Sequence, residues 1–415
     1  MKFFINSYFG DNQSIGLLSH IKKRLPYGMD DQWMVFSHYT ERGWTVDNLW
    51  HIFTDFYGGQ YAPLAFLSYL VLYAGFGYDP FYFHMFSLLL HIGCVCLVWK
   101  LISSLLPVHG GVSEKQILYV NFITTLLFAV HPINVEAVAW ISALKVLLYA
   151  FFYLLGLLCY LRYIRTSKIF YYVLTIGCFL CSFWGKEQAV TFPLALLIVD
   201  WFTNRNMKNL EVWSEKMSFL IMAFFFGIIT VLSQGKGPYE MIFPLYQRLL
   251  FGCFALVEYI TKSLLPVNLN FFYPFPIVLG EEPPLHYYLY PVVLLFLMGW
   301  IIAYRNNRYL VFGVLLFLVN LLFSIHLFNM SRHAIVADRY MYLSYVGIAF
   351  LIANGIWWLR KRLSYFKAAL VFLFFYCFFL SVYTFHYTKK WENTTMVKKY
   401  TKEVLEKRLN GSNHL

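Results

Sequence analysis

The chain is dominated by long apolar segments that are separated by short polar connections. Most of these segments approach the roughly 20 apolar residues that an α-helix needs to cross the hydrocarbon layer of a bilayer. Tilt and burial among neighbouring helices accommodate the shorter segments. A transmembrane β-barrel would instead show alternating segments of about ten residues. The pattern therefore predicts an all-α polytopic membrane protein with transmembrane helices at 80–101, 117–130, 144–163, 169–184, 188–203, 217–233, 288–304, 309–326, 340–358 and 368–387.

The connections between these segments alternate in charge. Every second connection carries Lys or Arg on both flanks, beginning with Lys100 and Lys115 and ending with Arg360 and Lys367. Because basic loops stay on the cytoplasmic side of a membrane, the other connections are expected on the outer side. The basic tail is an exception to this bias. The outer side would then receive 1–79, 131–143, 185–187, 234–287, 327–339 and 388–415.

Three parts follow from this topology. Residues 1–79 form a first outer loop, in which 61–75 is expected as an amphipathic helix on the membrane interface. No spanning segment or signal peptide is evident before residue 80, so a first transmembrane helix is expected to be missing. Residues 80–387 form the transmembrane domain, with an outer loop at 234–287 whose 246–265 stretch is again interfacial. Residues 388–415 are predicted to be a short polar tail, forming a solvated helix.

Composition agrees with a membrane protein. The chain is 60% hydrophobic and 13% charged, whereas a soluble domain carries about 25% charged residues. The formal net charge of +12 is attributed to the basic loops rather than to nucleic-acid binding. Most of the seven cysteines lie in apolar runs, so neither a disulfide framework nor a zinc site is expected. Nucleotide-binding, metalloprotease and nucleophile-elbow motifs are absent from the sequence.

Two of the outer connections carry acidic residues that are candidates for acid–base chemistry. Asp30 and Asp31 lie side by side in the first outer loop, where two adjacent like charges raise one pKa. Such a carboxylate can accept or orient the proton of a hydroxyl group, although a turn or a helix N-cap also explains the pair. Glu136 follows His131 and Pro132 between two predicted spans, and a negative charge near the first turn of a helix is favourable in itself.

Basic residues near the same membrane face indicate an anion. Lys145 follows Glu136 by nine residues and is costly at that depth without a partner such as Glu136 or a phosphate. Lys186 lies next to Glu187, as either an interfacial ion pair or an anion contact. Arg339 lies at a helix start, where a cation is unfavourable unless it meets an anion. Asp338 beside it is expected to cap the helix.

Several segments together resemble a known family. They are Asp30-Asp31, Tyr61-Ala62-Pro63-Leu64, Phe128 to Trp140 with His131-Pro132 and Glu136, Lys186-Glu187-Gln188, Leu265-Pro266 with Tyr273-Pro274, and Ala337-Asp338-Arg339-Tyr340. In this order they are similar to the GT-C membrane glycosyltransferases related to protein O-mannosyltransferases, and most similar to the transmembrane-and-tetratricopeptide group and its bacterial relatives. The resemblance covers about residues 27–350, and it implies a GT-C-like helical bundle.

The resemblance also implies roles for particular residues. An acidic residue of the Asp30-Asp31 pair would be the catalytic base, and Glu136 would help to position acceptor or donor. Lys145 and Arg339 would bind the donor phosphate, with Lys186 and His131 as further phosphate-binding candidates. The donor would be a polyprenyl-phosphate sugar, and mannose is one candidate for the sugar. No metal or other cofactor would be tightly bound. The repeat domain of the larger relatives is absent from these residues.

The function expected from these observations is glycosyl transfer from the lipid-linked donor to a hydroxyl group of a protein, glycan or lipid acceptor at the outer membrane face. The alternatives are a transporter or flippase for a lipid-linked glycan, and an inactive, truncated relative. A transporter would need charged residues near the midplane of the bilayer on several helices, whereas here they gather at one face. The expected location is a bacterial inner membrane with the site facing the periplasm or exterior, or the endoplasmic reticulum membrane of a eukaryote.

Overall fold

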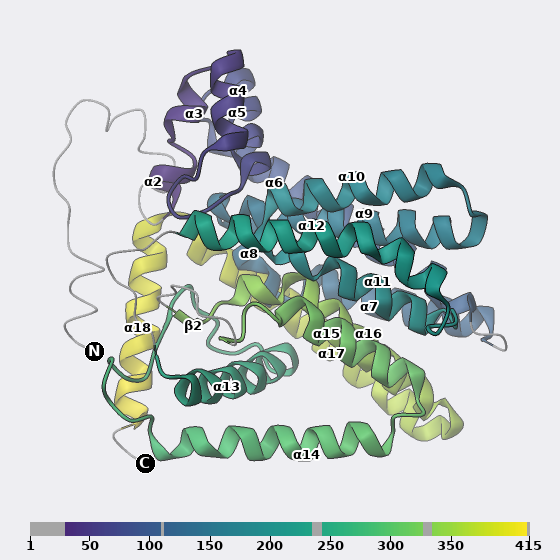
Figure 1. Cartoon of the computed structure of the whole chain (residues 1–415). Coiled ribbons are helices and arrows are strands. Elements are labelled where there is room, and N and C mark those ends of the chain that lie inside the picture. The colour runs from purple at the N-terminus through teal and green to yellow at the C-terminus, as the bar shows by residue number, and fades with distance from the viewer. Residues whose placement is uncertain (1–29, 109–111, 235–242, 327–333, 413–415) are drawn as a thin grey trace.

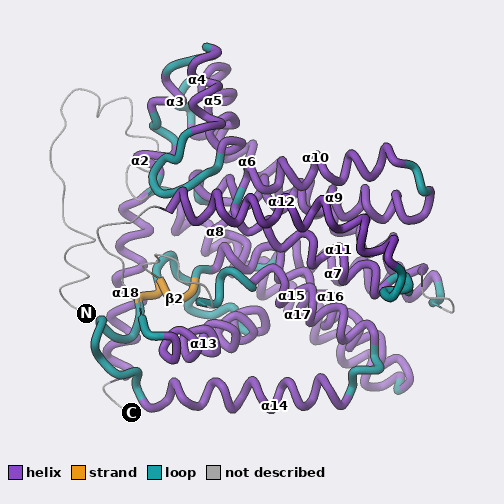
Figure 2. Tube along the Cα trace, viewed as in Figure 1, coloured by secondary structure: helices purple, strands orange, loops and turns teal. Residues whose placement is uncertain are grey.

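A computed structural model describes residues 30–108, 112–234, 243–326 and 334–412. Helices make up about 80% of this part of the chain. A single pair of short strands lies at one end of the described molecule (Figures 1 and 2). Each of the ten predicted spans contains an α-helix, because long apolar runs are broken only where Pro, Gly or charged residues occur. These helices are α6 (Pro80–Leu105), α7 (Glu114–Val130), α9 (Leu144–Thr166), α10 (Ile169–Gly185), α11 (Phe192–Phe202), α12 (Leu210–Gln234), α14 (Leu289–Ala303), α15 (Arg308–Leu321), α16 (Met341–Trp358) and α17 (Leu363–Thr388).

Length separates these helices into two groups. Six helical stretches in the described residues are long and apolar enough to cross a membrane, and a seventh span results if α7 is joined to the bent segment that follows it. The helices α10 and α15 are apolar but shorter. A 3-10 turn, η5 (Glu187–Thr191), takes up the beginning of the predicted span at 188–203 and leaves α11 with 11 residues. The protein is therefore a helical membrane protein, while the count of ten spans stays a prediction.

The helices place the connections at two opposite ends (Figure 1). The turns between α9 and α10, between α14 and α15 and between α16 and α17 lie at one end, and these are basic connections. The opposite end holds the short helices and the strands. They are α2 (Asp31–Met34), α3 (His38–Glu41), α4 (Val46–Thr54), α5 (Pro63–Phe76), η3 (Pro132–Asn134), α8 (Val135–Ala139), η4 (Ile141–Ala143), α13 (Leu245–Leu264), β1 (Tyr273–Pro274), β2 (Ala334–Val336), η7 (Asp338–Tyr340), η9 (Lys389–Trp391) and α18 (Thr394–Ser412). We call this the polar end.

Close helix packing fixes the centre of the bundle. Most of the span that begins at Ile141 is buried, and α9 packs against both α6 and α10. Gly185 at the end of α10 lies against the backbone of Tyr149 in α9, where a Cβ atom would come within 2.8 Å of the Tyr149 nitrogen. Small residues permit such close approach between helices in membranes. The end of α9 that lies at the polar end is thereby held in place, and it carries Lys145.

The two antiparallel strands join distant parts of the polar end. Tyr273 in β1 pairs with Val336 in β2, and Pro274 pairs with Ala334. This pairing brings the loop after α13 next to η7, which contains Asp338 and Arg339. The described part of the connection between α12 and α14 is therefore not a separate unit, because β1 pairs with the strand that leads into the helix start predicted to carry functional residues.

Two expectations about interfacial elements need correction. The predicted amphipathic helix at 61–75 exists as α5, but its exposed positions include Val71 and Phe76, so apolar residues occur on its open side as well. The tail is helical, as predicted, but it is not solvated on all sides. Val397, Thr401 and Val404 of α18 are buried, because they pack onto the polar end rather than project from it.

Candidate functional site

Asp31 is held at the beginning of the central span. It opens α2 and is 2% exposed, and its Oδ1 atom accepts hydrogen bonds from the backbone N–H (3.0 Å) and the hydroxyl group of Ser142 in η4. These two residues are 111 positions apart in the chain. The segment that begins with α2 is thus attached to the residues that lead directly into α9.

The second carboxylate oxygen of Asp31 has no hydrogen-bond partner. The indole N–H of Trp140 lies close enough to influence this carboxylate but forms no hydrogen bond of normal geometry. Burial raises the pKa of Asp31 to about 7, and the hydrogen bonds from Ser142 oppose this rise. A buried carboxylate with a free oxygen and a pKa near neutrality suits a general base. Asp30 is more exposed than Asp31 and interacts electrostatically with Lys145.

Glu136 and Arg339 form an ion pair across the polar end. The Glu136 side chain is fully buried in α8, and its Oε1 atom lies 2.5 Å from Nη1 of Arg339. The backbone N–H of Arg339 donates to the other oxygen of Glu136 at 2.7 Å. The prediction that Arg339 must meet an anion is confirmed, and the anion is Glu136. This pairing makes Glu136 a residue that orients Arg339.

Arg339 retains hydrogen-bonding capacity after this pairing. Its guanidinium group lies between aromatic rings, 5.3 Å from the Trp140 ring and 5.2 Å from the Tyr340 ring. The side chain is 19% exposed, and among the described residues only Nη1 donates to a protein acceptor. A guanidinium group has five N–H donors in a planar fork that matches a phosphate. The remaining donors are therefore available to an anionic ligand.

Two lysines join Arg339 in what we call the basic cluster (Lys145, Lys186 and Arg339). The Nζ atom of Lys145 donates to Oε1 of Gln60 at 2.5 Å, and Nζ of Lys186 lies 4.9 Å from the centre of the Tyr340 ring. Both lysines are almost completely buried, and Lys186 has no hydrogen-bond acceptor or ion-pair partner within the described residues. The cluster therefore concentrates positive charge that its protein neighbours only partly balance.

The pKa of Lys186 reflects this arrangement. The pKa is lowered to about 8, mainly by burial. Glu187 and Tyr340 oppose this lowering, and the cations of Lys145 and Arg339 add to it. A bound phosphate would supply the negative charge that stabilises the protonated lysine. The sequence placed these three cations in separate segments, and the structure brings them to one end of the bundle.

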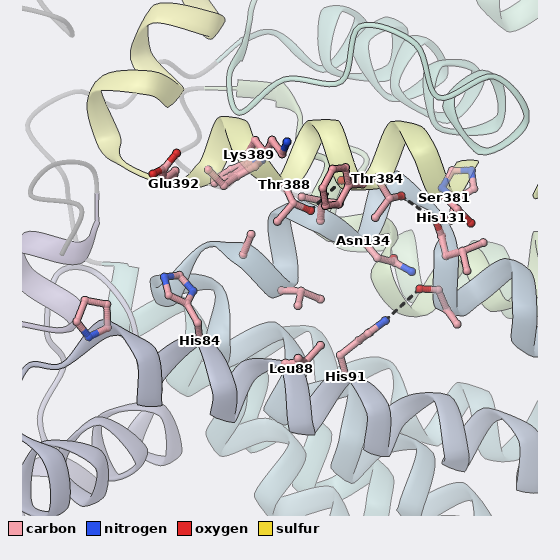
Figure 3. A pocket seen from close by; sticks show the side chains of 18 residues that line it. His84, Leu88, His91, His131, Asn134, Ser381, Thr384, Thr388, Lys389 and Glu392 are labelled. Carbon is pink, nitrogen blue, oxygen red and sulfur yellow. Dashed lines mark hydrogen bonds between the residues drawn. The ribbon is translucent and has the colours of Figure 1, made fainter. Parts of the chain in front are cut away.

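His131 does not join the basic cluster. Its Nδ1 atom accepts a hydrogen bond from the backbone N–H of Ile133 at 3.2 Å, and its ring lies 4.1 Å from that of Tyr345. These contacts fix the bend between α7 and η3. His131 also lines an apolar cavity of about 860 Å³ between α6, α8 and α17, together with His84, His91 and Asn134 (Figure 3). These contacts do not place His131 beside the three cations, so its predicted role in phosphate binding stays a prediction.

Asp338 does not cap a helix, contrary to the expectation from its position. Its side chain makes no capping hydrogen bond. Instead both of its oxygens accept from the hydroxyl group of Tyr273 at 3.0 Å, and Nζ of Lys262 lies 3.8 Å away. The sequence pattern alone predicts no role for Tyr273 or Lys262. Lys262 lies among the apolar positions of α13, and this placement in the sequence could have indicated a buried cation that needs a partner.

A second ion cluster lies toward the other end of the bundle, where none was expected. Asp200 and Lys216 are both fully buried and their charged atoms are 2.5 Å apart. Arg205 contacts Glu215 at 2.6 Å, and Tyr160 donates to Asp200 at 2.7 Å. The expectation that charged groups capable of chemistry gather at only one face is therefore wrong. This cluster joins α9, α11 and α12.

Comparison with known proteins identifies relatives of the chain. It is 32% identical over 189 residues to the protein O-mannosyl-transferase TMTC2 of Mus musculus, an alignment that covers 41% of this chain and 21% of that protein. It is 28% identical over 172 residues to the protein O-mannosyl-transferase Tmtc3 of Drosophila melanogaster, covering 37% and 18%. For the protein O-mannosyl-transferase TMTC4 of Homo sapiens the identity is 31% over 167 residues, covering 35% and 22%.

The matches cover only part of this chain and a smaller part of each relative. The chain spans about a fifth of the length of the curated relatives that it matches. No family model matches the chain, and no solved structure matches it. The matches nevertheless agree with one another and with the resemblance of the sequence segments. Over about two fifths of its length, the chain is a relative of the TMTC protein O-mannosyl-transferases.

Proposed function

We propose that the protein is a glycosyltransferase that moves a sugar, mannose in the first instance, from a polyprenyl-phosphate donor to a hydroxyl group of a protein acceptor. The observation that carries this proposal is the combination of a buried carboxylate with one free oxygen, at Asp31, and the basic cluster at the same end of a membrane-spanning bundle. The names of the relatives support transfer of mannose to protein. No tightly bound metal or other cofactor is part of the proposal.

The chemistry requires a base and a stabilised leaving group. The acceptor oxygen attacks the anomeric carbon of the sugar and forms the new glycosidic bond, while Asp31 takes the hydroxyl proton. The bond between the anomeric carbon and the phosphate oxygen breaks, and polyprenyl phosphate leaves with the electron pair. Arg339 and Lys186 stabilise the charge that develops on the phosphate, because both have donors that the protein leaves unused. Lys145 adds to the positive potential.

Asp31 fits the role of the base better than Asp30. Its pKa near neutrality and its unpaired oxygen allow it to accept a proton at physiological pH. Asp30 is assigned to balancing the charge of Lys145. The proposal puts the polar end on the outer face of the membrane. Its support is that basic connections lie at the opposite end, and basic loops stay on the cytoplasmic side. The compartment is a bacterial periplasm or exterior, or the lumen of the endoplasmic reticulum.

The proposal is tested with purified protein in lipid nanodiscs, mannosyl phosphoryl polyprenol and a serine- and threonine-containing acceptor peptide. Asp31→Asn should lower the rate of transfer by about a thousandfold, because it removes the base, and Asp30→Asn should lower it much less. Mass analysis of the peptide gives the product. Full activity of Asp31→Asn would refute the assignment. If the wild-type protein moves the donor between leaflets without transferring sugar, the transporter alternative applies instead.

A further inference from the structure

The carboxy-terminal segment packs against the residues that hold Arg339. The turn η9 and the helix α18 follow α17, and α18 runs across the polar end near β2 (Figure 1). Trp391, Val397, Thr401 and Val404 are buried along this segment. Neither the sequence pattern nor the proposed mechanism assigns a role to them. Two separate series of contacts connect this segment to the site.

The first series of contacts consists of hydrogen bonds. The hydroxyl group of Thr401 donates to Oδ1 of Asn270 at 2.8 Å, and the backbone N–H of Asn270 donates to the hydroxyl oxygen of Tyr273 at 2.6 Å. Tyr273 in turn donates to Asp338. All four side chains are at most 1% exposed, and Asp338 directly precedes Arg339. Buried polar networks of this kind hold their members in one arrangement when every partner is present.

The second series of contacts consists of packed aromatic rings. The Trp391 ring lies 6.3 Å from that of Trp140, and Phe271 packs edge-on against Trp140 at 5.2 Å and against Trp391 at 6.1 Å. Trp140 faces the guanidinium group of Arg339 at 5.3 Å and also lies beside Asp31. The orientation of the Trp140 ring therefore affects both the cation and the acid of the proposed reaction.

We infer that residues 389–404 are a positioning element of the site, in which Thr401 and Trp391 orient Arg339 without touching the substrate. This inference rests on the proposed function of Arg339 as a phosphate ligand. Arg339 must present its free N–H donors at a fixed angle to grip a phosphate with two parallel hydrogen bonds. A small change in the backbone at Asp338 or in the plane of Trp140 would misalign these donors.

The test uses the full chain in nanodiscs and measures two quantities, the Kd for polyprenyl phosphate and the kcat and KM for the mannosyl donor. Thr401→Val removes the hydroxyl group at nearly constant volume, and it should raise both Kd and donor KM about fivefold, consistent with the loss of one buried hydrogen bond. Thr401→Ser should restore wild-type values. The matched control is Thr395→Val, because Thr395 is exposed on the same helix.

Trp391 gives a second, independent comparison. Trp391→Ala should raise donor KM about tenfold, since an aromatic contact and its packing are lost, whereas Trp391→Phe should retain most of the affinity. Wild-type Kd and KM in Thr401→Val and Trp391→Ala, or changes confined to thermal stability, would overturn the inference while leaving the proposed function intact. If wild-type protein binds no polyprenyl phosphate, the proposed function and this inference both fail.

Discussion

At the scale of single residues, two cations of the polar end, Arg339 and Lys145, are held by partners that lie far away in the chain. Arg339 was expected to meet an anion, and it pairs with Glu136, which lies 203 positions away. Lys145 was expected to need Glu136 or a phosphate, yet it donates to Gln60. The cost of burying a charge can be read from its position in an apolar segment. The identity of its partner depends on tertiary packing, which one sequence does not contain.

The titrations of Asp31 and Lys186 predict a pH dependence of transfer. Asp31 acts as a base only when it is deprotonated, so kcat/KM for the donor should rise with pH through about 7. Lys186 binds phosphate only when it is protonated, so the same quantity should fall above about pH 8. We expect a narrow bell-shaped profile, measured as initial transfer rates between pH 5 and pH 10.

Two variants separate the limbs of this profile. Ser142→Ala removes the hydroxyl hydrogen bond to Asp31, which lowers the pKa of Asp31, and leaves the backbone N–H donor in place, so the rising limb should move to higher pH. Lys186→Arg keeps its charge at all accessible pH values, so the falling limb should move to higher pH or disappear. Unmoved limbs in these variants would show that other groups control the profile.

At the scale of elements, the sequence predicts where the helices lie but not the 3-10 turns that interrupt them near the candidate site residues. Apolar runs predicted the positions of all ten helices, since burial or lipid contact requires such runs in every case. Their ends differ from the prediction by up to seven residues, as at the start of α12. The breaks were harder to predict. The 3-10 turns η3, η4 and η5 interrupt the helices at Pro132, at Ile141 and at Glu187, and the first and third of them lie next to predicted site residues. Local backbone interruptions of this kind depend on the neighbouring helices.

Helix contact between α15 and α16 provides a prediction at this scale. A Cβ atom at Gly347 would lie 2.5 Å from the backbone oxygen of Gly313 and 2.7 Å from the nitrogen of Phe317. Gly347→Ala should therefore push the helices apart and lower the free energy of unfolding by about 1–3 kcal/mol. Gly355 in the same helix has no neighbouring atom within 4 Å. Gly355→Ala should be neutral or stabilising by up to about 1 kcal/mol, as measured by thermal unfolding in detergent.

At the scale of the whole molecule, charge alternation and three-dimensional structure lead to the same two-sided arrangement. Basic connections gather at one end, and the acidic pair, the basic cluster and α18 gather at the other (Figure 1). The buried cluster around Asp200 and Lys216 was not predicted, because the basic residues of that region were attributed to topology alone. A charge pattern indicates the side of the membrane on which a loop lies, but it does not distinguish a solvated lysine from a buried, paired one.

The two-sided arrangement is tested by labelling from each side of the membrane. Single cysteines are introduced at Lys168, in a basic connection, and at Thr395, in the tail, within a variant whose seven native cysteines are replaced. Both positions are exposed, so each should react with a membrane-impermeant maleimide that reaches its side. Because the tail is basic, the charge rule alone would place Thr395 in the cytoplasm, whereas its packing against the polar end requires it to lie with Asp31 on the outer side. Labelling of Thr395 only from outside and of Lys168 only after permeabilisation would follow from the structure. Reaction of both positions from the same side would contradict the bundle orientation, and with it the outward-facing site.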